Sequence, residues 1–212
     1  SHRMRTVHAV LLPMHVPPLL TLTVVQPARA LLDLAFPRVC LGCSKRLRHA
    51  GSAPPVCPSC RRRVPSADAQ TLVRRFEKLP IHVPLAHVVA LWTYDEHSTV
   101  AHLQHRLKYG NRPQLGEALG RWLAEALPAC SFDLVVPVPL HRQRLLARGY
   151  NQSACLARGV ASARGLCLDE RLLGRSRSTR SQTNLDHQAR WANVYGAFTT
   201  TPSLSVSGMH VL

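Results

Sequence analysis

From residue 88 onward, short apolar runs alternate with amphipathic stretches. The apolar runs contain β-branched residues and lie between turn signals, which predicts buried strands. These predicted strands cover residues 88–94, 134–138, 168–173, 194–199 and 206–212. Apolar residues at helical spacing predict helices between them. The predicted helices cover residues 96–128 (two helices, broken at Gly110 and Pro113), 152–164 and 185–193. Strands that alternate with helices predict an α/β fold with a mostly parallel sheet.

The predicted strand at residues 134–138 has an abrupt end. Pro137 and Pro139 lack a backbone N–H, so the chain must leave the sheet near them. A basic loop with Arg144 and Arg148 follows, and a new helix starts near Asn151. Cationic side chains beside a helix N-terminus, at the carboxyl end of a strand, favour an anion. The alternative is a solvated arginine-rich loop, and residue types alone do not decide between the two.

Composition and charge narrow the class of partner. The 212 residues suffice for one full domain and a small module, and a hydrophobic content of 46% supports a folded core. Lysine and arginine number 27 against 11 acidic residues, which gives a net charge of +16. Such a charge predicts attraction to polyanions: nucleic acid, phosphorylated metabolites or an acidic membrane surface.

The seven cysteines are unevenly spaced. Two CxxC pairs, Cys40 with Cys43 and Cys57 with Cys60, are separated by thirteen residues. Two such turns supply the four thiolates of a closed tetrahedral Zn²⁺ site, in which the metal is structural because protein fills every position. A redox-active or accidental CxxC pair is the alternative. The other cysteines stand alone, and we expect them to be small core residues; they are Cys130, Cys155 and Cys167.

Basic residues flank the four sulfurs of the predicted zinc site. We expect their charge to lower the pKa of the thiols and to offset the anionic zinc centre. They are Arg38, Lys45, Arg46, Arg61, Arg62 and Arg63. The pattern predicts a zinc ribbon over residues 31–65, too small to fold without its metal. A connector over residues 66–87 and the α/β domain over residues 88–212 follow it.

Residues 1–30 give the weakest signal. Their apolar run is broken by prolines, so we expect an N-terminal extension that is flexible or not native, and no stable membrane span. A signal peptide is the alternative, because Ala28-Arg29-Ala30 follows the apolar run. Free thiols at a metal site are kept in a reducing compartment, which favours the cytoplasm.

Three histidines, His97, His102 and His105, lie on the first predicted helix. They have no carboxylate or cysteine at a spacing suited to a metal. We therefore expect a solvated helix face rather than a second metal site.

Four blocks of the sequence together resemble the ComF/GntX family. The first is FPRVCLGC with CPSC, the second is LKYG at residues 107–110, and the third is VPVPLHRQRLLARGYNQ at residues 136–152. The fourth block runs from Thr179 to Phe198 and includes Gln182, Leu185, Arg190, Asn193, Gly196 and Ala197. The resemblance covers residues 30–212, with the blocks in the family's order. Its members are phosphoribosyltransferase-like proteins with an N-terminal zinc ribbon, associated with natural competence.

The resemblance implies a type I phosphoribosyltransferase fold, a parallel sheet flanked by helices. Such folds bind 5-phosphoribosyl-1-pyrophosphate (PRPP) and Mg²⁺ at the carboxyl ends of the strands. Lys108, Arg144 and Arg148 would then contact the pyrophosphate or phosphate. Gly149 would let the backbone approach the ligand, and Asn151 would cap the following helix. No general base and no acceptor substrate follow from the resemblance.

The chain departs from the family in one respect. The PRPP signature, an acidic pair followed by a Thr-Thr-Gly loop, does not occur in these residues. Residues 208–212 resemble the start of the strand that precedes it. We expect the signature to follow Leu212 in a complete chain, and transferase activity only if it does.

The sequence therefore leaves two functional hypotheses open. One is binding of a PRPP-like phosphorylated small molecule, with phosphoribosyl transfer when the chain is complete. The other is a non-catalytic zinc-ribbon scaffold in DNA uptake that binds single-stranded DNA or proteins of the competence machinery. Aromatic residues make up only 5% of the chain, which leaves little for base stacking.

Overall fold

The computed structural model describes residues 37–40, 42–47, 56–68, 72–74, 86–130, 132–179, 185–201 and 205–212. The predicted extension at residues 1–30 and most of the predicted connector lie outside them. The chain divides into two units, residues 1–38 and 39–212. Every contact reported below lies within the second unit.

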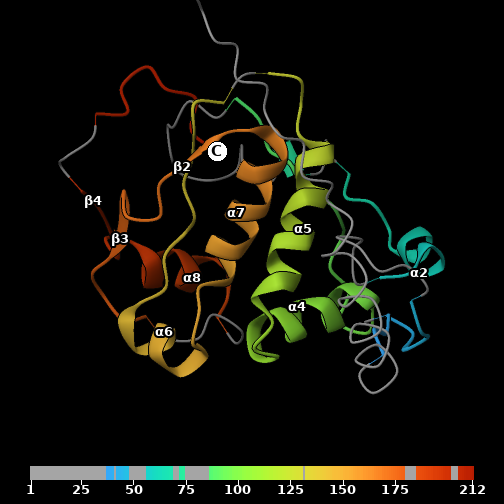
Figure 1. Cartoon of the computed structure of the whole chain (residues 1–212). Coiled ribbons are helices and arrows are strands. Elements are labelled where there is room, and N and C mark those ends of the chain that lie inside the picture. Colours follow the sequence, from blue (N-terminus) through green and yellow to red (C-terminus); the bar gives the residue numbers. More distant parts are fainter. Residues whose placement is uncertain are drawn as a thin grey trace, which may run out of the picture. The chain divides into compact units, whose positions relative to one another are not determined.

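The described elements mix helices with short strands (Figure 1). The helices are α2 Pro58–Arg63, α4 Thr99–Tyr109, α5 Pro113–Ala126, α6 Arg142–Arg148, α7 Gln152–Arg164 and α8 His187–Val194. The strands are β1 Leu134–Val135, β2 Cys167–Leu168, β3 Leu173–Arg175 and β4 Phe198–Thr200. Helices separate β1 from β2 and β3 from β4, as predicted, but no helix lies among the described residues between β2 and β3. The strand predicted at residues 194–199 is wrong in its bounds, because α8 continues to Val194 and β4 begins at Phe198.

β1 is the central strand of the parallel pairing. It pairs with β2, with Leu134 opposite Cys167 and Val135 opposite Leu168. On its other side Leu134 forms a parallel bridge with Val211. The N–H of Leu212 donates to the carbonyl of Leu134 at 2.9 Å. The predicted strand at residues 206–212 is wrong over its first half, where Ser207 and Gly208 form a turn, and only residues 210–212 run beside β1, in the order β2, β1, residues 210–212.

β1 is shorter than predicted, since it ends at Val135 rather than residue 138. The two prolines explain the difference because neither can donate to a neighbouring strand. The chain leaves the sheet where their positions predict.

The predicted strand at residues 168–173 is wrong, because the structure divides it into β2 and β3. The carboxylate of Asp169 accepts from the backbone N–H groups of Arg171 at 2.7 Å and Leu172 at 3.0 Å. This turn separates the two strands, because a carboxylate that binds the backbone two residues ahead fixes a turn. β3 then pairs antiparallel with β4, with Arg175 opposite Phe198.

The predicted strand at residues 88–94 is also wrong. Only one antiparallel bridge forms there, between Ser66 and Trp92. The N–H of Thr93 donates to the carbonyl of Pro65 at 3.1 Å. β-branched residues favour an extended backbone, but a strand also needs a partner of similar length, and residues 65–67 offer a very short one.

α5 and α7 lie side by side and form the principal helix pair of the fold (Figure 1). Glycines allow their backbones to touch. A Cβ on Gly120 of α5 would lie 2.1 Å from the carbonyl oxygen of Leu156, and a Cβ on Gly159 of α7 would lie 2.1 Å from that of Glu117. The bounds predicted for α7 are confirmed, and those for α4 and α5 agree within a few residues.

The predicted basic loop after β1 is wrong, because its arginines lie on the helix α6. His141 caps the N-terminus of this helix by accepting from the N–H of Gln143 at 3.4 Å. Gly149 ends it in the left-handed conformation, with φ +80°. None of the residues in α6 is buried, so the apolar periodicity that would predict a core-facing helix is absent.

Candidate functional site

The four cysteines of the two CxxC pairs converge on one centre. Their sulfur atoms all lie within 4.8 Å of one another, and the Sγ atoms of Cys43 and Cys57 are 3.7 Å apart. The first pair lies on a tight turn closed by the N–H of Ser44, which donates to the carbonyl of Cys40 at 2.8 Å. The second pair lies at the start of α2, where Cys57 is the N-cap and Cys60 lies within the helix.

Backbone N–H groups point at these sulfurs. Cys40 Sγ accepts from the N–H of Gly42 at 3.3 Å and from that of Cys57 at 3.2 Å. Burial acts to raise the pKa of Cys40, but N–H donors from Cys57, Cys43 and Gly42 outweigh it and lower the pKa to about 6. Hydrogen bonds from these backbone groups therefore stabilise the thiolate of Cys40, and the expected contribution of the flanking basic side chains stays a prediction.

The arrangement fits a tetrahedral metal. A zinc–sulfur bond of about 2.3 Å places neighbouring sulfurs about 3.8 Å apart in a tetrahedron, close to the separation of Cys43 and Cys57. Burial and the neighbouring cysteines raise the pKa of Cys60 to about 12, because a thiolate beside it disfavours a second negative charge. Cys40, Cys43, Cys57 and Cys60 would hold Zn²⁺, which would supply folding energy to the ribbon.

The cysteine centre shares a core with the helices that follow. Cys40 and Cys60 are buried in one apolar cluster with side chains of α4 and α5. Its other buried members are Val56, Leu103, Leu107, Leu115, Leu119 and Trp122. Arg61 of α2 also contacts α5: its guanidinium lies 4.5 Å from the ring centroid of Trp122 and binds Glu125 at 2.9 Å. The ribbon is thus packed on α5.

The second candidate site begins where β1 ends. Asn151 is the N-cap of α7, as predicted: its Oδ1 accepts from the N–H of Ser153 at 3.1 Å. Its Nδ2 donates to the carbonyl of Val138 at 3.1 Å, which ties the segment after β1 to the start of α7. Gly149 has the left-handed backbone that glycine favours.

Two of the motif blocks meet beside Gly149. The guanidinium of Arg148 lies 5.5 Å from the ring centroid of Tyr109 and donates to Gln152 at 2.6 Å. The hydroxyl of Tyr150 donates to the carbonyl of Leu107. Lys108 lies between these contacts in sequence, on the last turn of α4. The structure therefore brings the block at residues 107–110 to the block that contains Arg148.

Arg144 contacts the fourth motif block, which begins at Thr179. Arg144 lies one helical turn before Arg148 on α6, so the two side chains share a face of the helix. Its Nη2 donates to the backbone carbonyl of Thr179 at 2.6 Å. The Nη2 of Arg175 donates to the hydroxyl of the same threonine at 2.5 Å. Among the described residues, neither Arg144 nor Arg175 forms an ion pair with a carboxylate.

Neither Arg175 nor the burial of Thr179 was predicted from the sequence. Thr179 is 7% exposed. No sequence signal marks a buried threonine inside a run of serines and arginines. The only indication was the position of Thr179 at the start of the fourth motif block.

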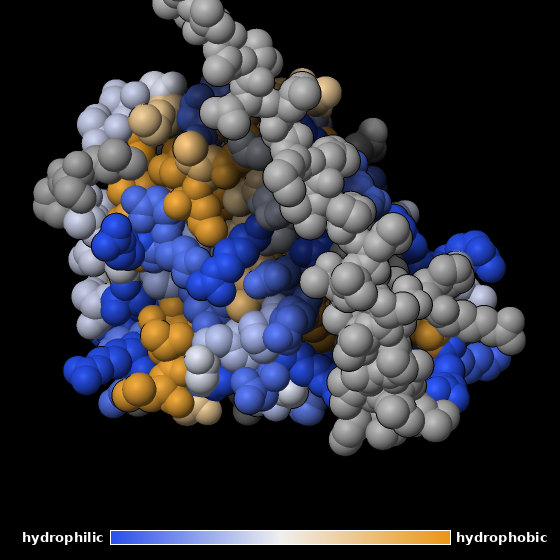
Figure 2. Space-filling model, viewed as in Figure 1, coloured by the Kyte–Doolittle hydropathy of each residue, from blue (hydrophilic) through white to orange (hydrophobic). Residues whose placement is uncertain are grey.

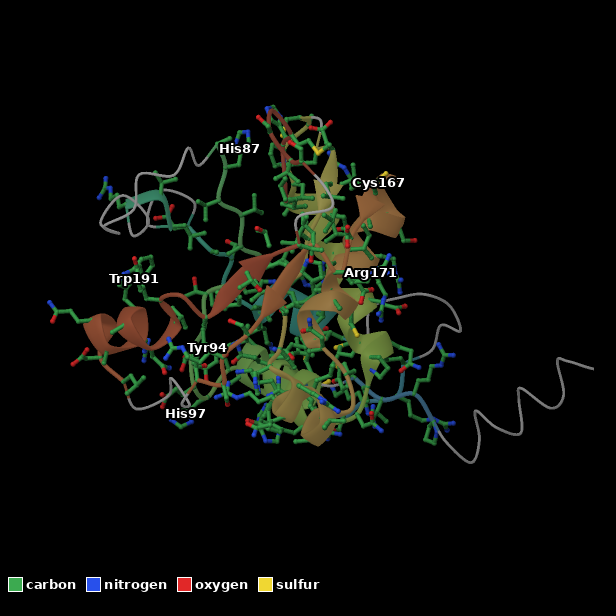
Figure 3. All side chains as sticks on the ribbon, turned by 90° about the vertical axis from the view of Figure 1, so that its left-hand side faces the viewer. His87, Tyr94, His97, Cys167, Arg171 and Trp191 are labelled. Carbon is green, nitrogen blue, oxygen red and sulfur yellow. The ribbon has the colours of Figure 1, made fainter. Side chains whose placement is uncertain are left out.

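Two further predictions concern the three histidines near α4 and the cysteines outside the CxxC pairs. His97, His102 and His105 are exposed, as expected for a solvated helix face. Within the described ranges, the four cysteines form the one group of potential metal ligands. Cys155 is fully buried, whereas Cys167 is exposed, so the prediction of a core position is wrong for Cys167 (Figure 3).

The face of the molecule around α6 is strongly hydrophilic, with a small hydrophobic patch over α6 itself (Figure 2). The exposed apolar residues of this helix are Leu145 and Leu146. No helix in the described part of the chain is long and apolar enough to cross a membrane.

Fold and site define a mixed α and β protein with four cysteines close enough together to hold a metal ion and with arginines on the helix that follows its central parallel strand. Over 188 residues the chain is 30% identical to the DNA utilization protein YhgH of Salmonella typhimurium, covering 85% of this chain and 78% of that protein. It is 28% identical over 181 residues to the Escherichia coli (strain K12) protein of the same name, covering 82% and 75% of the two chains. The chain belongs to the family of these proteins. No family model and no solved structure matches it.

Proposed function

We propose that this protein acts in DNA utilization by binding a phosphorylated ligand at the carboxyl end of β1, on a scaffold held by structural zinc. One observation carries the proposal. Arg144 and Arg148 occupy one face of α6, directly after the central strand, and neither is paired with a carboxylate in the described part of the chain. Unpaired guanidiniums at such a position favour a phosphate group, which they can bind through two parallel N–H donors.

The neighbouring residues suit the same ligand. Lys108 would add a third positive charge from the end of α4. Gly149 would allow the backbone to approach the ligand closely, while Asn151 holds the N-terminus of α7 next to it. A helix N-terminus adds partial positive charge.

PRPP with Mg²⁺ is the ligand we propose, in a protein of ComF/GntX type with a phosphoribosyltransferase-like domain over residues 88–212. The parallel order of β2, β1 and residues 210–212 supports it, since ligands of such sheets bind beyond the carboxyl ends of the strands. Whether phosphoribosyl transfer follows depends on the acidic pair and loop of the PRPP signature.

Titration calorimetry with inorganic pyrophosphate tests the anion site in this chain. Arg148→Ala should weaken binding about tenfold or more, the cost of one charge-assisted contact. Arg142→Ala is the matched control. Arg142 is exposed on the same helix, two residues from Arg144, and so points to the opposite side. Equal affinities of the two variants would contradict the assignment of Arg148.

Single-stranded DNA is the second candidate ligand. The relatives are named DNA utilization proteins, the net charge is +16, and the ring of Tyr109 is 69% exposed beside Arg148, where a base could stack. Affinity for an oligonucleotide should fall steeply with salt, because each phosphate contact releases counterions. An affinity that is flat with salt would remove direct DNA binding and favour a protein partner in the uptake machinery.

A cytoplasmic location is also proposed, because free thiolates that hold a metal persist in a reducing compartment. Cell fractionation with an antibody against the chain tests it. Recovery with the soluble cytoplasmic marker supports the proposal, and recovery outside the cytoplasm contradicts it.

A further inference from the structure

Arg175 lies at the end of β3 in contact with two groups. Its guanidinium lies 5.2 Å from the ring centroid of Phe198, its partner on β4. Its Nη2 donates to the hydroxyl of Thr179. Its Nε is buried and has no hydrogen-bond partner among the residues that the structure describes. A buried donor without an acceptor costs free energy unless something else satisfies it.

The charge around Arg175 is unbalanced. Arg144 and Arg175 both donate to Thr179, so the two guanidiniums stand close together. Burial, and then the charge of Arg144, lower the pKa of Arg175. No carboxylate in the described part of the chain pairs with either arginine. Two like charges that share one neighbour in a partly buried place repel each other, and a bound anion would turn this repulsion into attraction.

We propose that Arg175, Arg144 and Thr179 form an oxyanion site that takes a phosphate group. The proposal rests on the proposed function, because Arg144 also belongs to the anion site after β1. It adds a second side to that site: α6 supplies Arg144, and the β3–β4 pair supplies Arg175 from a part of the chain that the motif after β1 does not include.

The contacts leave donors for a ligand. Each guanidinium has five N–H donors in a planar fork, and the hydrogen bonds to Thr179 use only the Nη2 of each arginine. The ring of Phe198 packs against the guanidinium of Arg175, and Thr179 accepts a hydrogen bond from the guanidinium of each arginine. Because these contacts already hold both guanidiniums in place, the two side chains lose little entropy when a phosphate binds, which strengthens binding.

A phosphate group can come from pyrophosphate or from the backbone of single-stranded DNA, so the test has two arms. Affinities for inorganic pyrophosphate and for a single-stranded deoxythymidine oligonucleotide are measured on the full chain and on Arg175→Gln. Arg171→Gln is the matched control, since Arg171 is exposed on the loop just before β3 and its loss removes the same charge (Figure 3). Arg175→Gln should weaken binding about tenfold or more in at least one arm, and that arm names the source of the phosphate.

The outcome separates this proposal from the previous one. If Arg175→Gln binds pyrophosphate and the oligonucleotide with the same affinities as Arg171→Gln, the oxyanion site is overturned. This holds even where Arg148→Ala weakens the binding of pyrophosphate. Conversely, an effect of Arg175→Gln without any effect of Arg148→Ala would keep this site and reject the assignment of Arg148.

A second measurement needs no variant and guards against misfolding. Phenylglyoxal modifies arginine side chains, and mass spectrometry locates the modified residues. In the unaltered protein, the probe that binds should slow the modification of Arg144 and Arg175 about tenfold while that of Arg171 stays unchanged. Equal rates with and without both probes, at all three arginines, would overturn the proposal.

Discussion

The hydroxyl of Tyr150 donates a hydrogen bond to the backbone carbonyl of Leu107. Leu107 lies in the last turn of α4, where carbonyl oxygens have no partner within the helix. Tyr150 therefore satisfies an orphan acceptor and joins two segments that lie 43 residues apart. Through this bond the end of α4, with Lys108 and Tyr109, is held beside the end of α6, with Arg148.

Replacing Tyr150 by phenylalanine should lower the free energy of unfolding by about 1 kcal/mol, because the buried carbonyl of Leu107 loses its donor. Urea denaturation followed by fluorescence measures the change. Tyr195→Phe is the control, since the Tyr195 side chain is exposed. A loss no larger than that of the control would show that the hydrogen bond does not stabilise the junction.

Gly120→Ala should cost about 3 kcal/mol of stability, because a Cβ 2.1 Å from the carbonyl oxygen of Leu156 forces α5 and α7 apart. Gly165→Ala is a useful contrast. Gly165 has open space around it but a left-handed backbone with φ +64°, so alanine should cost only about 1 kcal/mol. Equal losses for the two variants would contradict the close crossing of α5 and α7.

Cys57→Ser should abolish zinc binding, since three thiolates do not complete the closed site. Metal analysis should find about one zinc per chain in the unaltered protein and in Cys167→Ser, whose thiol is exposed away from the cluster. The tryptophan fluorescence should also change in Cys57→Ser, because Arg61 of the ribbon packs on Trp122. Full zinc content in Cys57→Ser would rule out the four-cysteine site.

The buried thiol of Cys155 predicts a pH dependence of stability. Burial raises its pKa in the folded chain, whereas in the unfolded chain a thiol titrates near about 8.5. Its contribution to stability is therefore complete below that pH and is lost as the pH rises toward the folded pKa, because the unfolded chain releases the proton first.

Urea denaturation at pH values from about 7 to about 10, spanning the ordinary thiol range, measures this contribution. The difference in stability between the unaltered protein and Cys155→Ala should shrink as pH rises. A difference that is constant with pH would mean that Cys155 does not titrate differently in the two states.

The parts of the fold that the sequence could predict depend on local signals. α7 has Asn151 as its N-cap and Gly165 as its C-cap, and both ends were predicted from those residues. The cysteine centre follows from spacing, because a CxxC turn fixes two sulfurs regardless of what packs against it. Pro137 and Pro139 predict that the chain leaves the sheet near them, although β1 ends at Val135, before the predicted residue 138.

The remaining features depend on partners that are distant in sequence. α6 buries none of its residues, so no apolar period marks it as a helix. Residues 88–94 have strand-like composition but find only the short segment at residues 65–67 as a partner. The meeting of Arg144 with Arg175 at Thr179 joins positions more than thirty residues apart, and the pattern around either arginine alone does not indicate it.

The most direct test of the central claim, that a phosphate group binds between α6 and the β3–β4 pair, is an NMR titration of the arginine Nε–H signals with pyrophosphate. If a phosphate group binds there, the signals of Arg144, Arg148 and Arg175 should shift together and saturate. The signal of Arg158, which is held by Glu170 at 2.7 Å, should stay in place. Shifts that are spread evenly over all arginines, or no shift at Arg144, Arg148 and Arg175, would contradict the claim.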